Sequence, residues 1–517
     1  MDSALRKQLK DIAWCKEVWK EPVCSGAARD LVRQCASLPT SEPEPEADLL
    51  QVIDSSRRFP VPFPIDTVRL EKLKLKHPAE RLIRNISSTY PIIHERVVLL
   101  IANFLIYKRK YGSKIEKELY KNMTIADLID RILKKRAVTF IKAQDQYKLL
   151  SGHKGVDGWE SVGTDEEKPP LLLKDCLSYD EMKIAALVSV SGRTVCINDG
   201  TRKNAGVVRE DNVESEAIII GVIGPRFKRT NRMEYEDMLV TEDQNIPENG
   251  YGTDAPDAAK RAWRQLWEDF YQIPSTTHSA LTARVKLVPC SGKRVFGERW
   301  ARVKTFAFDN LAYHRRTRLL ADLVLAEANA RAKEEGKSAF LNVIGAGLGL
   351  WKVSGHQLDV YILTFLERIV ALLDEGQLDN VADVNFAYIK PGKEVAAFFK
   401  ECKENPECKK LFIKNESHPR GGLNVQLENR EPSTRLSGAH EGKLLVLTYA
   451  WDSNAHPGNE FWIGKLSSSG DSAAACATQI TELHNAHINP AVCGERARVA
   501  AARVQTLQQY AATLQTI

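Results

Sequence analysis

Two patterns of apolar positions divide the chain into two parts. Up to about residue 165 the apolar residues recur mostly with helical periodicity, and no apolar run leads into a glycine-rich turn. From about residue 171 short apolar runs alternate with helical stretches, which is typical of an α/β domain. The connector at residues 151–170 is rich in Gly, Asp and Glu and ends in two prolines. We therefore predict a mainly helical N-terminal module at residues 1–165 and an α/β domain at residues 166–517.

The apolar runs predict individual elements. Strands are expected at residues 194–197, 217–222, 339–344, 384–388 and 444–449, each ending near Gly, Asn or Asp. Helices are expected at residues 256–271, 311–335, 356–373, 473–484 and 491–514. In the N-terminal module, the apolar run at residues 91–101 is expected to open a long helix.

Composition and charge mainly exclude certain classes of protein and of binding site. The 517 residues are 43% hydrophobic and 27% charged, and no stretch approaches the roughly 20 consecutive apolar residues of a membrane span. The charged N-terminus does not resemble a secretion signal, so we expect an intracellular, cytoplasmic protein, with the nucleus as an alternative. The ten cysteines are scattered without a CxxC pair, which predicts no zinc site. A net charge of +6 does not by itself indicate nucleic acid as a partner.

The first segment with candidate chemistry is a glycine-rich turn after the predicted strand at 339–344. Gly345, Gly347 and Gly349 alternate there, so that backbone N–H groups can close around a pyrophosphate next to a helix N-terminus. A dinucleotide-binding Rossmann turn is the main alternative, but it has GxGxxG spacing and an acidic residue at the next strand end. Here Asp383 comes much too late, and Glu367 falls inside a predicted helix. A glycine-rich turn without a ligand remains the second alternative.

A second segment follows the predicted strand at 217–222. Gly224, Arg226 and Phe227 form a tight loop, and two carboxylates follow at Glu234 and Glu236. In helical geometry positions i and i+2 point about 200° apart, so the two carboxylates would have separate roles. One could bind ribose hydroxyls while the other, raised in pKa by apolar neighbours, transfers protons. The alternative is an exposed acidic helix start.

Two further polar loops follow predicted strands. Asp452, Asn454, Asn459 and Glu460 lie just after the strand at 444–449, where α/β sheets bind ligands, although a turn-and-cap role is also open. Asn198 and Asp199 follow the strand at 194–197, and this loop could be only a turn. We expect all four loops to meet at the same edge of one sheet.

Together these segments resemble the macrodomain superfamily. They are most similar to its poly(ADP-ribose) glycohydrolase branch and to divergent relatives that cleave mono-ADP-ribose, including bacterial effectors that act on ADP-ribosylated ubiquitin. The resemblance covers about residues 171–490, with Gly345 to Trp351 similar to the diphosphate loop and Trp351 placed where an aromatic flanks the distal ribose. The family's paired glutamates are adjacent, whereas this chain has Glu-Tyr-Glu at 234–236 and Gly-Pro-Arg in place of a three-glycine run.

The resemblance implies a three-layer macrodomain-like fold with a mixed central sheet, and an ADP-ribosylhydrolase that needs no cofactor or metal. The expected substrate is an ADP-ribosylated protein, with arginine among the open linkages and ubiquitin among the open carriers, and the expected state is a monomer. A reader that binds ADP-ribose without cleaving it and an unrelated nucleotide enzyme are the alternatives. The expected catalytic residues are Glu234, Glu236 and Asp452, and the expected ligand-binding residues are Asn198, Asp199, Gly224, Arg226, Phe227, Gly345, Gly347, Leu348, Gly349, Trp351, Asn454, Asn459 and Glu460.

Overall fold

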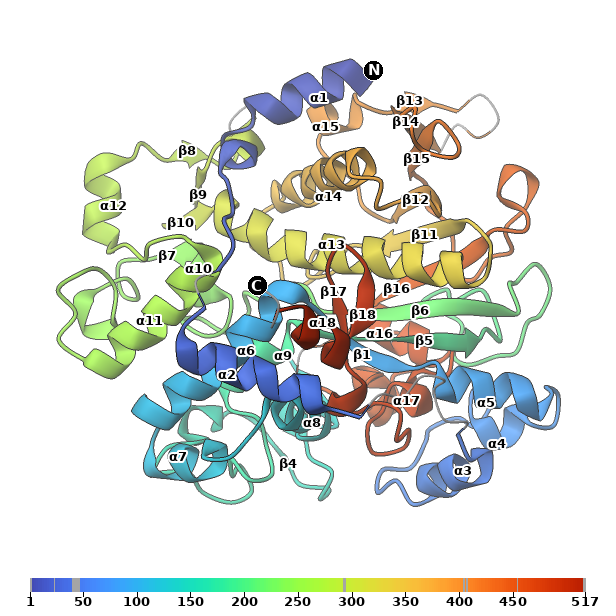
Figure 1. The fold of residues 1–517 in the computed structure, drawn as a ribbon, viewed down its shortest axis with the longest axis horizontal. Coiled ribbons are helices and arrows are strands. Elements are labelled where there is room, and N and C mark those ends of the chain that lie inside the picture. Colours follow the sequence, from blue (N-terminus) through green and yellow to red (C-terminus); the bar gives the residue numbers. More distant parts are fainter. Residues whose placement is uncertain are drawn as a thin grey trace.

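The computed structural model describes residues 2–22, 24–39, 47–291, 294–402, 405, 408–452 and 454–514. Within these ranges the chain forms a large mixed sheet of eleven strands, flanked by helices and by two small sheets (Figure 1). The order of the large sheet is β13-β14-β15-β12-β11-β16-β6-β5-β1-β17-β18. Its strands are β1 Tyr90–His94, β5 Val188–Val195, β6 Glu216–Val222, β11 Ala339–Ile344, β12 Val381–Ala387, β13 Lys400–Glu401, β14 Lys409–Lys414, β15 Gly422–Leu427, β16 Leu444–Ala450, β17 Arg498–Ala500 and β18 Val504–Thr506.

The centre of this sheet is parallel. β15, β12, β11, β16 and β6 run in one direction, whereas β5 is antiparallel to β6. Nearly every residue of β6, β11 and β16 is buried, as expected for parallel strands covered on both faces. The loops after β6, β11, β12 and β16 therefore leave from one edge of the sheet, and the loop after β5 leaves from the opposite edge.

Helices cover both faces of the sheet. Ser191 of β5 donates its hydroxyl to Glu327 of the long helix α13 at 2.6 Å. Thr194, on the other face of the same strand, accepts a hydrogen bond from the backbone N–H of Gln479 beside α17 at 2.9 Å. α13 lies across one face together with α14, as Figure 1 shows in yellow and orange. The structure is therefore mixed α/β with a helix layer on each side of the sheet.

The helices have the following bounds. In the first half of the chain they are α1 Asp2–Asp11, α2 Gly26–Gln34, α3 Leu49–Arg57, α4 Leu70–Leu73, α5 Ala79–Ser87, α6 Glu95–Tyr111, α7 Lys114–Tyr120, α8 Ile125–Lys134, α9 Tyr179–Ala185 and α10 Tyr235–Met238. In the second half they are α11 Ala258–Tyr271, α12 His278–Arg284, α13 Asn310–Glu334, α14 Gln357–Asp374, α15 Lys393–Ala396, α16 Gly470–Ala475, α17 Ile480–Leu483 and α18 Leu507–Thr513.

Two small sheets flank the large one. The first has the order β2-β3-β4, with β2 Thr139–Ile141, β3 Gln146–Lys148 and β4 Lys154–Gly155. The second has the order β7-β10-β9-β8, with β7 Leu239–Val240, β8 Val288–Pro289, β9 Trp300–Val303 and β10 Phe306–Asp309.

The N-terminal part is mainly helical, but a separate helical domain at residues 1–165 is not confirmed. β1 lies inside the large sheet between β5 and β17, and one continuous hydrophobic core extends from Leu5 to Ala511. The helix expected from residue 91 begins only at Glu95, because residues 90–94 are fully buried sheet. The N-terminal segment therefore supplies a structural strand of the sheet.

Most predicted elements of the α/β part are confirmed. The runs at 217–222, 339–344, 384–388 and 444–449 correspond to β6, β11, β12 and β16, and the run at 194–197 overlaps the end of β5. The predicted helices at 256–271, 311–335 and 356–373 correspond to α11, α13 and α14. The helix at 473–484 is wrong as a single element, because α16 and α17 divide it, and the helix at 491–514 is wrong except for α18.

Candidate functional site

The loops after β6 and β11 meet backbone to backbone. A Cβ atom built on Gly224 would lie 2.2 Å from the carbonyl carbon of Ala346, and one built on Gly347 would lie 2.9 Å from the carbonyl oxygen of Pro225. Gly347 also has φ +75°, a left-handed conformation that favours glycine. This close approach therefore requires glycine at positions 224 and 347, two of the residues predicted from the sequence to bind the ligand. We call residues 345–349 the glycine turn.

A cleft of about 210 Å³ lies beside the glycine turn. Its floor includes Ile219 of β6 and Leu447 of β16, and its walls include Leu348 and Gly349 of the turn and Ala473 of α16. Apolar side chains on the floor and backbone groups on the rim are the usual composition of a ligand site. The structure thus brings the glycine turn, β6 and β16 together around one cleft.

Tyr388 lies at the mouth of this cleft in a fixed position. Its backbone has φ +58°, its N–H donates to Asn429 Oδ1 at 3.0 Å, and its hydroxyl donates to Glu431 Oε1 at 2.7 Å. The side chain is nevertheless exposed, with 57% of its surface accessible. The cleft therefore has a rigid aromatic edge on the β12 side, which the sequence analysis did not predict.

The loop after β5 departs from the expectation of a common edge. Because β5 is antiparallel, this loop leaves from the opposite edge and reaches the cleft through Gly200 and Arg202. Asn198 is fully buried, donates to Cys476 O at 3.0 Å and accepts from Gly200 N at 3.0 Å. Asp199 accepts a hydrogen bond from Thr201 N at 3.0 Å. These two side chains hold the loop in shape, and neither lines the cleft among the residues the structure describes.

Three carboxylates gather after β16, next to the end of the cleft. Asp452 follows the strand directly, Glu460 lies in the same loop, and Asp471 lies in the first turn of α16. Burial and the charge of Glu460 raise the pKa of Asp452 to about 7, although the Asn459 amide and Arg226 oppose the shift. Burial and the other two carboxylates also raise the pKa of Asp471 well above its ordinary value. We call Asp452, Glu460 and Asp471 the acidic cluster.

The acidic cluster has few internal partners. Asn459 donates its amide to the Asp452 carboxylate, and Glu460 accepts from Ser469 Oγ at 2.7 Å. Asp471 Oδ1 accepts from Gly458 N at 2.8 Å, whereas its Oδ2 is buried without a hydrogen-bond partner among the described residues. Such a group favours a ligand that brings hydrogen-bond donors or positive charge.

Arg226, predicted from the sequence to bind the ligand, is a cation whose charge acts on Asp452. Its guanidinium is buried, pairs with Asp145 and donates to Lys142 O at 3.0 Å. Asp145 also accepts the Tyr179 hydroxyl at 2.6 Å. Both contacts use Nη2, and Nη1 has no hydrogen-bond partner in the part of the chain that the structure describes. Arg226 is therefore fixed on one side and keeps the N–H groups of Nη1 for a ligand.

The N-terminal segment completes the site. Asn459 Oδ1 accepts from Phe140 N at 2.9 Å, and Ala137 and Ala455 form a parallel bridge. Asn454 is fully buried with neither polar atom of its amide partnered among the described residues. The hairpin of β2 and β3 thus fixes the loop that carries Asp452 and Glu460. Nothing in the sequence around Phe140 or Asp145 indicated this role, because it arises from tertiary docking alone.

Glu234 and Glu236 lie in ion pairs of the interior. Glu234 is 3.3 Å from Arg316 Nη2, and Glu236 accepts from Trp263 Nε1 at 3.1 Å and pairs with Lys183 at 3.2 Å. Burial alone would raise the pKa of Glu236, but neighbouring cations lower it to about 2. Among the described residues Glu236 lines two other cavities and not the cleft. A carboxylate held in its ionised form by two cations is a poor proton carrier at neutral pH.

Two other expected residues lie outside the cleft wall. Phe227 is buried and makes an edge contact with Phe308 at 5.8 Å between ring centroids, which assigns it a packing role. Trp351 follows the glycine turn and is half-buried, but it is absent from the described lining of the cleft. The ribose-flanking position expected for Trp351 therefore stays a prediction.

No group of three or more His, Cys, Asp or Glu side chains among the described residues has an arrangement that could hold a metal ion. No helix among them is both long and apolar enough to span a bilayer.

Comparison with known proteins identifies relatives over most of the chain. A family model described as ADP-ribosylhydrolase MavL-like matches residues 50–513. The chain is 36% identical over 493 residues to ADP-ribosylarginine hydrolase CG2909 of Drosophila melanogaster, which covers 93% of this chain and 92% of the relative. It is 37% identical over 467 residues to ADP-ribosylarginine hydrolase CG3568 of the same organism, covering 89% of this chain and 86% of the relative.

Proposed function

The chain belongs to the MavL-like ADP-ribosylhydrolase family, and we propose that its acidic cluster cleaves ADP-ribose from arginine side chains of modified proteins. The membership makes the protein a hydrolase of ADP-ribosyl groups, which leaves the non-catalytic reader without support. The observation that carries the arginine linkage is the acidic cluster, in which Asp471 is buried and Asp452 and Glu460 are half-buried. Neighbouring carboxylates contribute to the raised pKa values of Asp452 and Asp471, so a cation is favoured beside them, and an ADP-ribosylated arginine brings a guanidinium.

The strand order supports one pose of the substrate. Along the carboxyl edge the neighbours are β12, β11 and β16, which carry Tyr388, the glycine turn and Asp452 respectively. The diphosphate binds to backbone N–H groups of the glycine turn, close to the start of α14. The distal ribose then lies toward Asp452, and the adenosine lies toward Tyr388. The macrodomain-like architecture inferred from the sequence is part of this proposal, supported by the mixed sheet with helices on both faces.

The reaction follows from this pose. The bond between the anomeric carbon of the ribose and the guanidine nitrogen breaks, and its electron pair leaves with the nitrogen. The resulting oxocarbenium-like centre is stabilised by the neighbouring carboxylates. Water attacks the anomeric carbon, and Asp452 takes the proton of that water. With a pKa of about 7, Asp452 exchanges protons readily at neutral pH, and the released guanidine is protonated to guanidinium.

The other residues of the site position these groups. Arg226 offers its free Nη1 to an oxygen of the substrate, and Asp145 holds the guanidinium in place. Asn459 orients the Asp452 carboxylate and is itself held by the backbone of Phe140. Ubiquitin is one candidate carrier of the modified arginine, chosen on the family resemblance of the sequence.

Isosteric substitution of the acidic cluster tests this proposal. Asp452→Asn, Glu460→Gln and Asp471→Asn should each lower the release of ADP-ribose from an arginine-linked substrate by about 100-fold or more, while ADP-ribose binding measured by calorimetry persists. The matched control is Glu210→Gln, since Glu210 is exposed and pairs with Lys76 on the surface. Activity within threefold of the unmodified protein in all three variants would show that the cluster is not catalytic. Hydrolysis of serine-linked or acidic-residue-linked substrates at equal rates would contradict the arginine assignment.

A further inference from the structure

A second, larger cavity lies away from the cleft. It has a volume of about 840 Å³ and is bounded by α6, α11 and the segment of residues 228–232. Among the described residues that line them, this cavity and the cleft share none. Its size lies within the range of about 300–1,000 Å³ that is usual for small-molecule sites. The reaction derived above does not use it.

The basic side chains of this second cavity fall into two groups. Arg229 and Arg264 are neutralised, with Arg229 3.0 Å from Asp157 and Arg264 3.0 Å from Glu236. Lys228, Arg232 and Lys260 also line the cavity, and in the described parts of the chain none of the three has a carboxylate within 4.0 Å. Three cations with no carboxylate of the described residues within 4.0 Å therefore line the second cavity.

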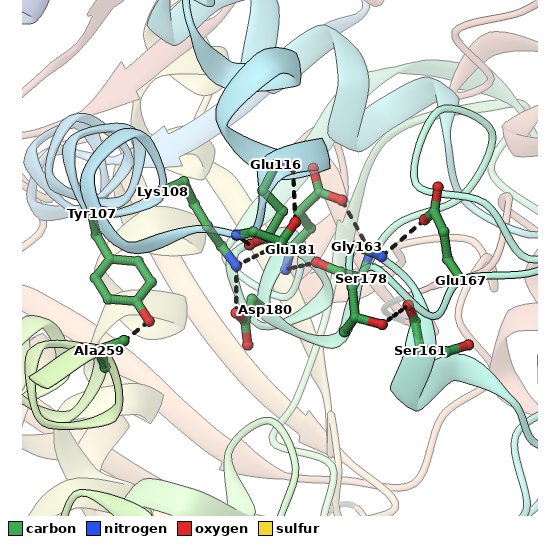
Figure 2. A network of polar contacts seen from close by, with 12 residues as sticks. Tyr107, Lys108, Glu116, Ser161, Gly163, Glu167, Ser178, Asp180, Glu181 and Ala259 are labelled. Atoms are coloured by element: carbon green, nitrogen blue, oxygen red, sulfur yellow. Dashed lines mark hydrogen bonds and ion pairs between the residues drawn. The ribbon is translucent and has the colours of Figure 1, made fainter. Parts of the chain in front are cut away.

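The acidic side chains of the second cavity are already engaged. Asp180 lies 2.6 Å from the buried Lys108, which also contacts Glu116 at 2.5 Å. Figure 2 shows Lys108 turned toward these two carboxylates, while its neighbour Tyr107 reaches across to Ala259 of α11. Glu236 is bound by Lys183 and Arg264. Glu160, the third carboxylate of the lining, pairs with Arg229 and also feels the charge of Arg232. The carboxylates are thus held by other cations, and among the described residues none lies within 4.0 Å of Lys228, Arg232 or Lys260.

Two buried oxygens of the second cavity lack donors. Gln244 is 1% exposed, and its amide nitrogen donates to Leu239 O at 2.9 Å, which fixes the orientation of the side chain. Its Oε1 then has no partner among the described residues, and Asn231 Oδ1 is in the same situation. A buried acceptor without a donor destabilises the folded protein. Both oxygens therefore favour a ligand with hydroxyl or amino groups.

The second cavity also has an aromatic wall. Tyr107 and Trp263 line it with their ring centroids 5.3 Å apart. Tyr107 is half-buried, and its hydroxyl is held by Ala259 O at 3.2 Å, so the wall is preorganised. The two rings are tilted by 45° to each other, and aromatic side chains next to cations and free acceptors suit a base and a sugar that carry phosphate.

We propose that the second cavity is a binding site for a nucleoside phosphate, separate from the ADP-ribose cleft. Lys228, Arg232 and Lys260 bind the phosphate groups. Gln244 and Asn231 accept hydrogen bonds from hydroxyl or amino groups of the ligand, and Tyr107 and Trp263 contact its base or sugar.

Calorimetric titration of ADP into the full chain at constant ionic strength tests the proposal. The chain carries Gly349→Trp, introduced to obstruct the cleft, because the residue lines the cleft and a Cβ there has no neighbour within 4 Å. ADP should bind to this variant at one site. Adding Lys228→Ala and Arg232→Ala should weaken binding at least tenfold, whereas the control pair Arg284→Ala and Lys286→Ala, exposed on and just after α12, should leave it unchanged.

Parallel titrations with pyrophosphate and with adenosine separate the parts of the ligand. Each should bind at least tenfold more weakly than ADP. If pyrophosphate binds as tightly as ADP, the second cavity is a simple anion site and the nucleoside part of the proposal is wrong. If ADP does not bind, or binds equally with and without Lys228 and Arg232, the whole proposal is wrong.

Discussion

Gly224 and Ala346 approach so closely that a methyl group on the glycine would lie 2.2 Å from the Ala346 carbonyl carbon. The two residues belong to loops that follow β6 and β11, which are separated in the sheet by β16. Their contact brings the loop that carries Arg226 against the glycine turn. The spacing between the diphosphate site and the catalytic groups therefore depends on the absence of one side chain.

Gly224→Ala should disrupt this spacing. Because the obstructing atoms are backbone, one of the two loops must move, at a cost of about 1–3 kcal/mol in the free energy of unfolding. We expect ADP-ribose affinity measured by calorimetry to fall at least tenfold, and hydrolysis to fall with it. Gly297→Ala is the matched control, because a Cβ there meets nothing within 4 Å and the residue does not line the cleft. Equal affinity in the two variants would contradict the role given to the contact.

The pH dependence of turnover should follow Asp452. Its pKa is raised to about 7, so the ionised base is lost as pH falls below that value. The kcat/KM for an arginine-linked substrate, which reports the free enzyme, should therefore fall about tenfold for each pH unit between pH 7 and pH 5. A plot of activity against pH should thus rise between pH 5 and pH 7, which we call the ascending limb, and the residual activity of Asp452→Asn should lack this rise. A flat profile for the unmodified enzyme would remove Asp452 from the role of base.

Arg226 should influence both the rate and the position of that limb. Its charge lowers the pKa of Asp452, against the larger effect of burial. Arg226→Gln should therefore move the ascending limb to higher pH and reduce the turnover number by about 10²–10³, since a donor to the substrate is lost. Arg226→Lys keeps a positive charge, so the limb should stay in place while the rate still falls, because an ammonium group cannot replace the guanidinium fork. If the ascending limb lies at the same pH in the unmodified enzyme, Arg226→Gln and Arg226→Lys, the charge of Arg226 does not influence the pKa of Asp452.

Glu236→Gln should behave as a stability variant. Its carboxylate pairs with Lys183 and Arg264 in the interior, and its loss leaves Arg264 without its carboxylate while Lys183 keeps Asp237 at 2.7 Å, at about 3 kcal/mol. The pKa of Glu236 is lowered to about 2 from an ordinary value of 4.5, so its contribution to stability is present above pH 4.5 and is lost between pH 4.5 and pH 2. Urea unfolding at pH 7 and pH 3 should show a smaller difference between variant and unmodified protein at pH 3. Folded Glu236→Gln at low temperature should keep turnover within threefold, and a loss of 100-fold would restore the catalytic assignment made from the sequence.

The central strands are the part of the fold that the sequence predicts best. The apolar runs at 217–222, 339–344 and 444–449 agree closely with β6, β11 and β16, because strands buried on both faces have continuous apolar sequences. The segment at 491–514 was mispredicted. Its many alanines favour a helix in isolation, but pairing of β17 with β1 outweighs that propensity.

The site was predictable to the extent that its residues follow those strands. The glycine turn, Arg226 and Asp452 lie within a few residues of the ends of β11, β6 and β16, and Glu460 lies in the same loop as Asp452. Asp145 and Asp471 were missed because the hairpin of β2 and β3 and the start of α16 approach the site only through tertiary packing. The ion pairs of Glu236 were equally invisible, since Lys183 and Arg264 come from other elements and nothing local indicates that they meet.

The position of β1 has a consequence for synthesis of the protein on the ribosome. Residues 90–94 emerge early, but their parallel neighbour β17 is made of residues 498–500, so this strand waits for nearly the whole chain before its second edge is covered. Until then it offers unpaired N–H and C=O groups to other nascent chains. Pairing across such a long sequence separation is also slow, which makes the growing polypeptide a natural client of chaperones and confines enzymatic competence to the finished chain.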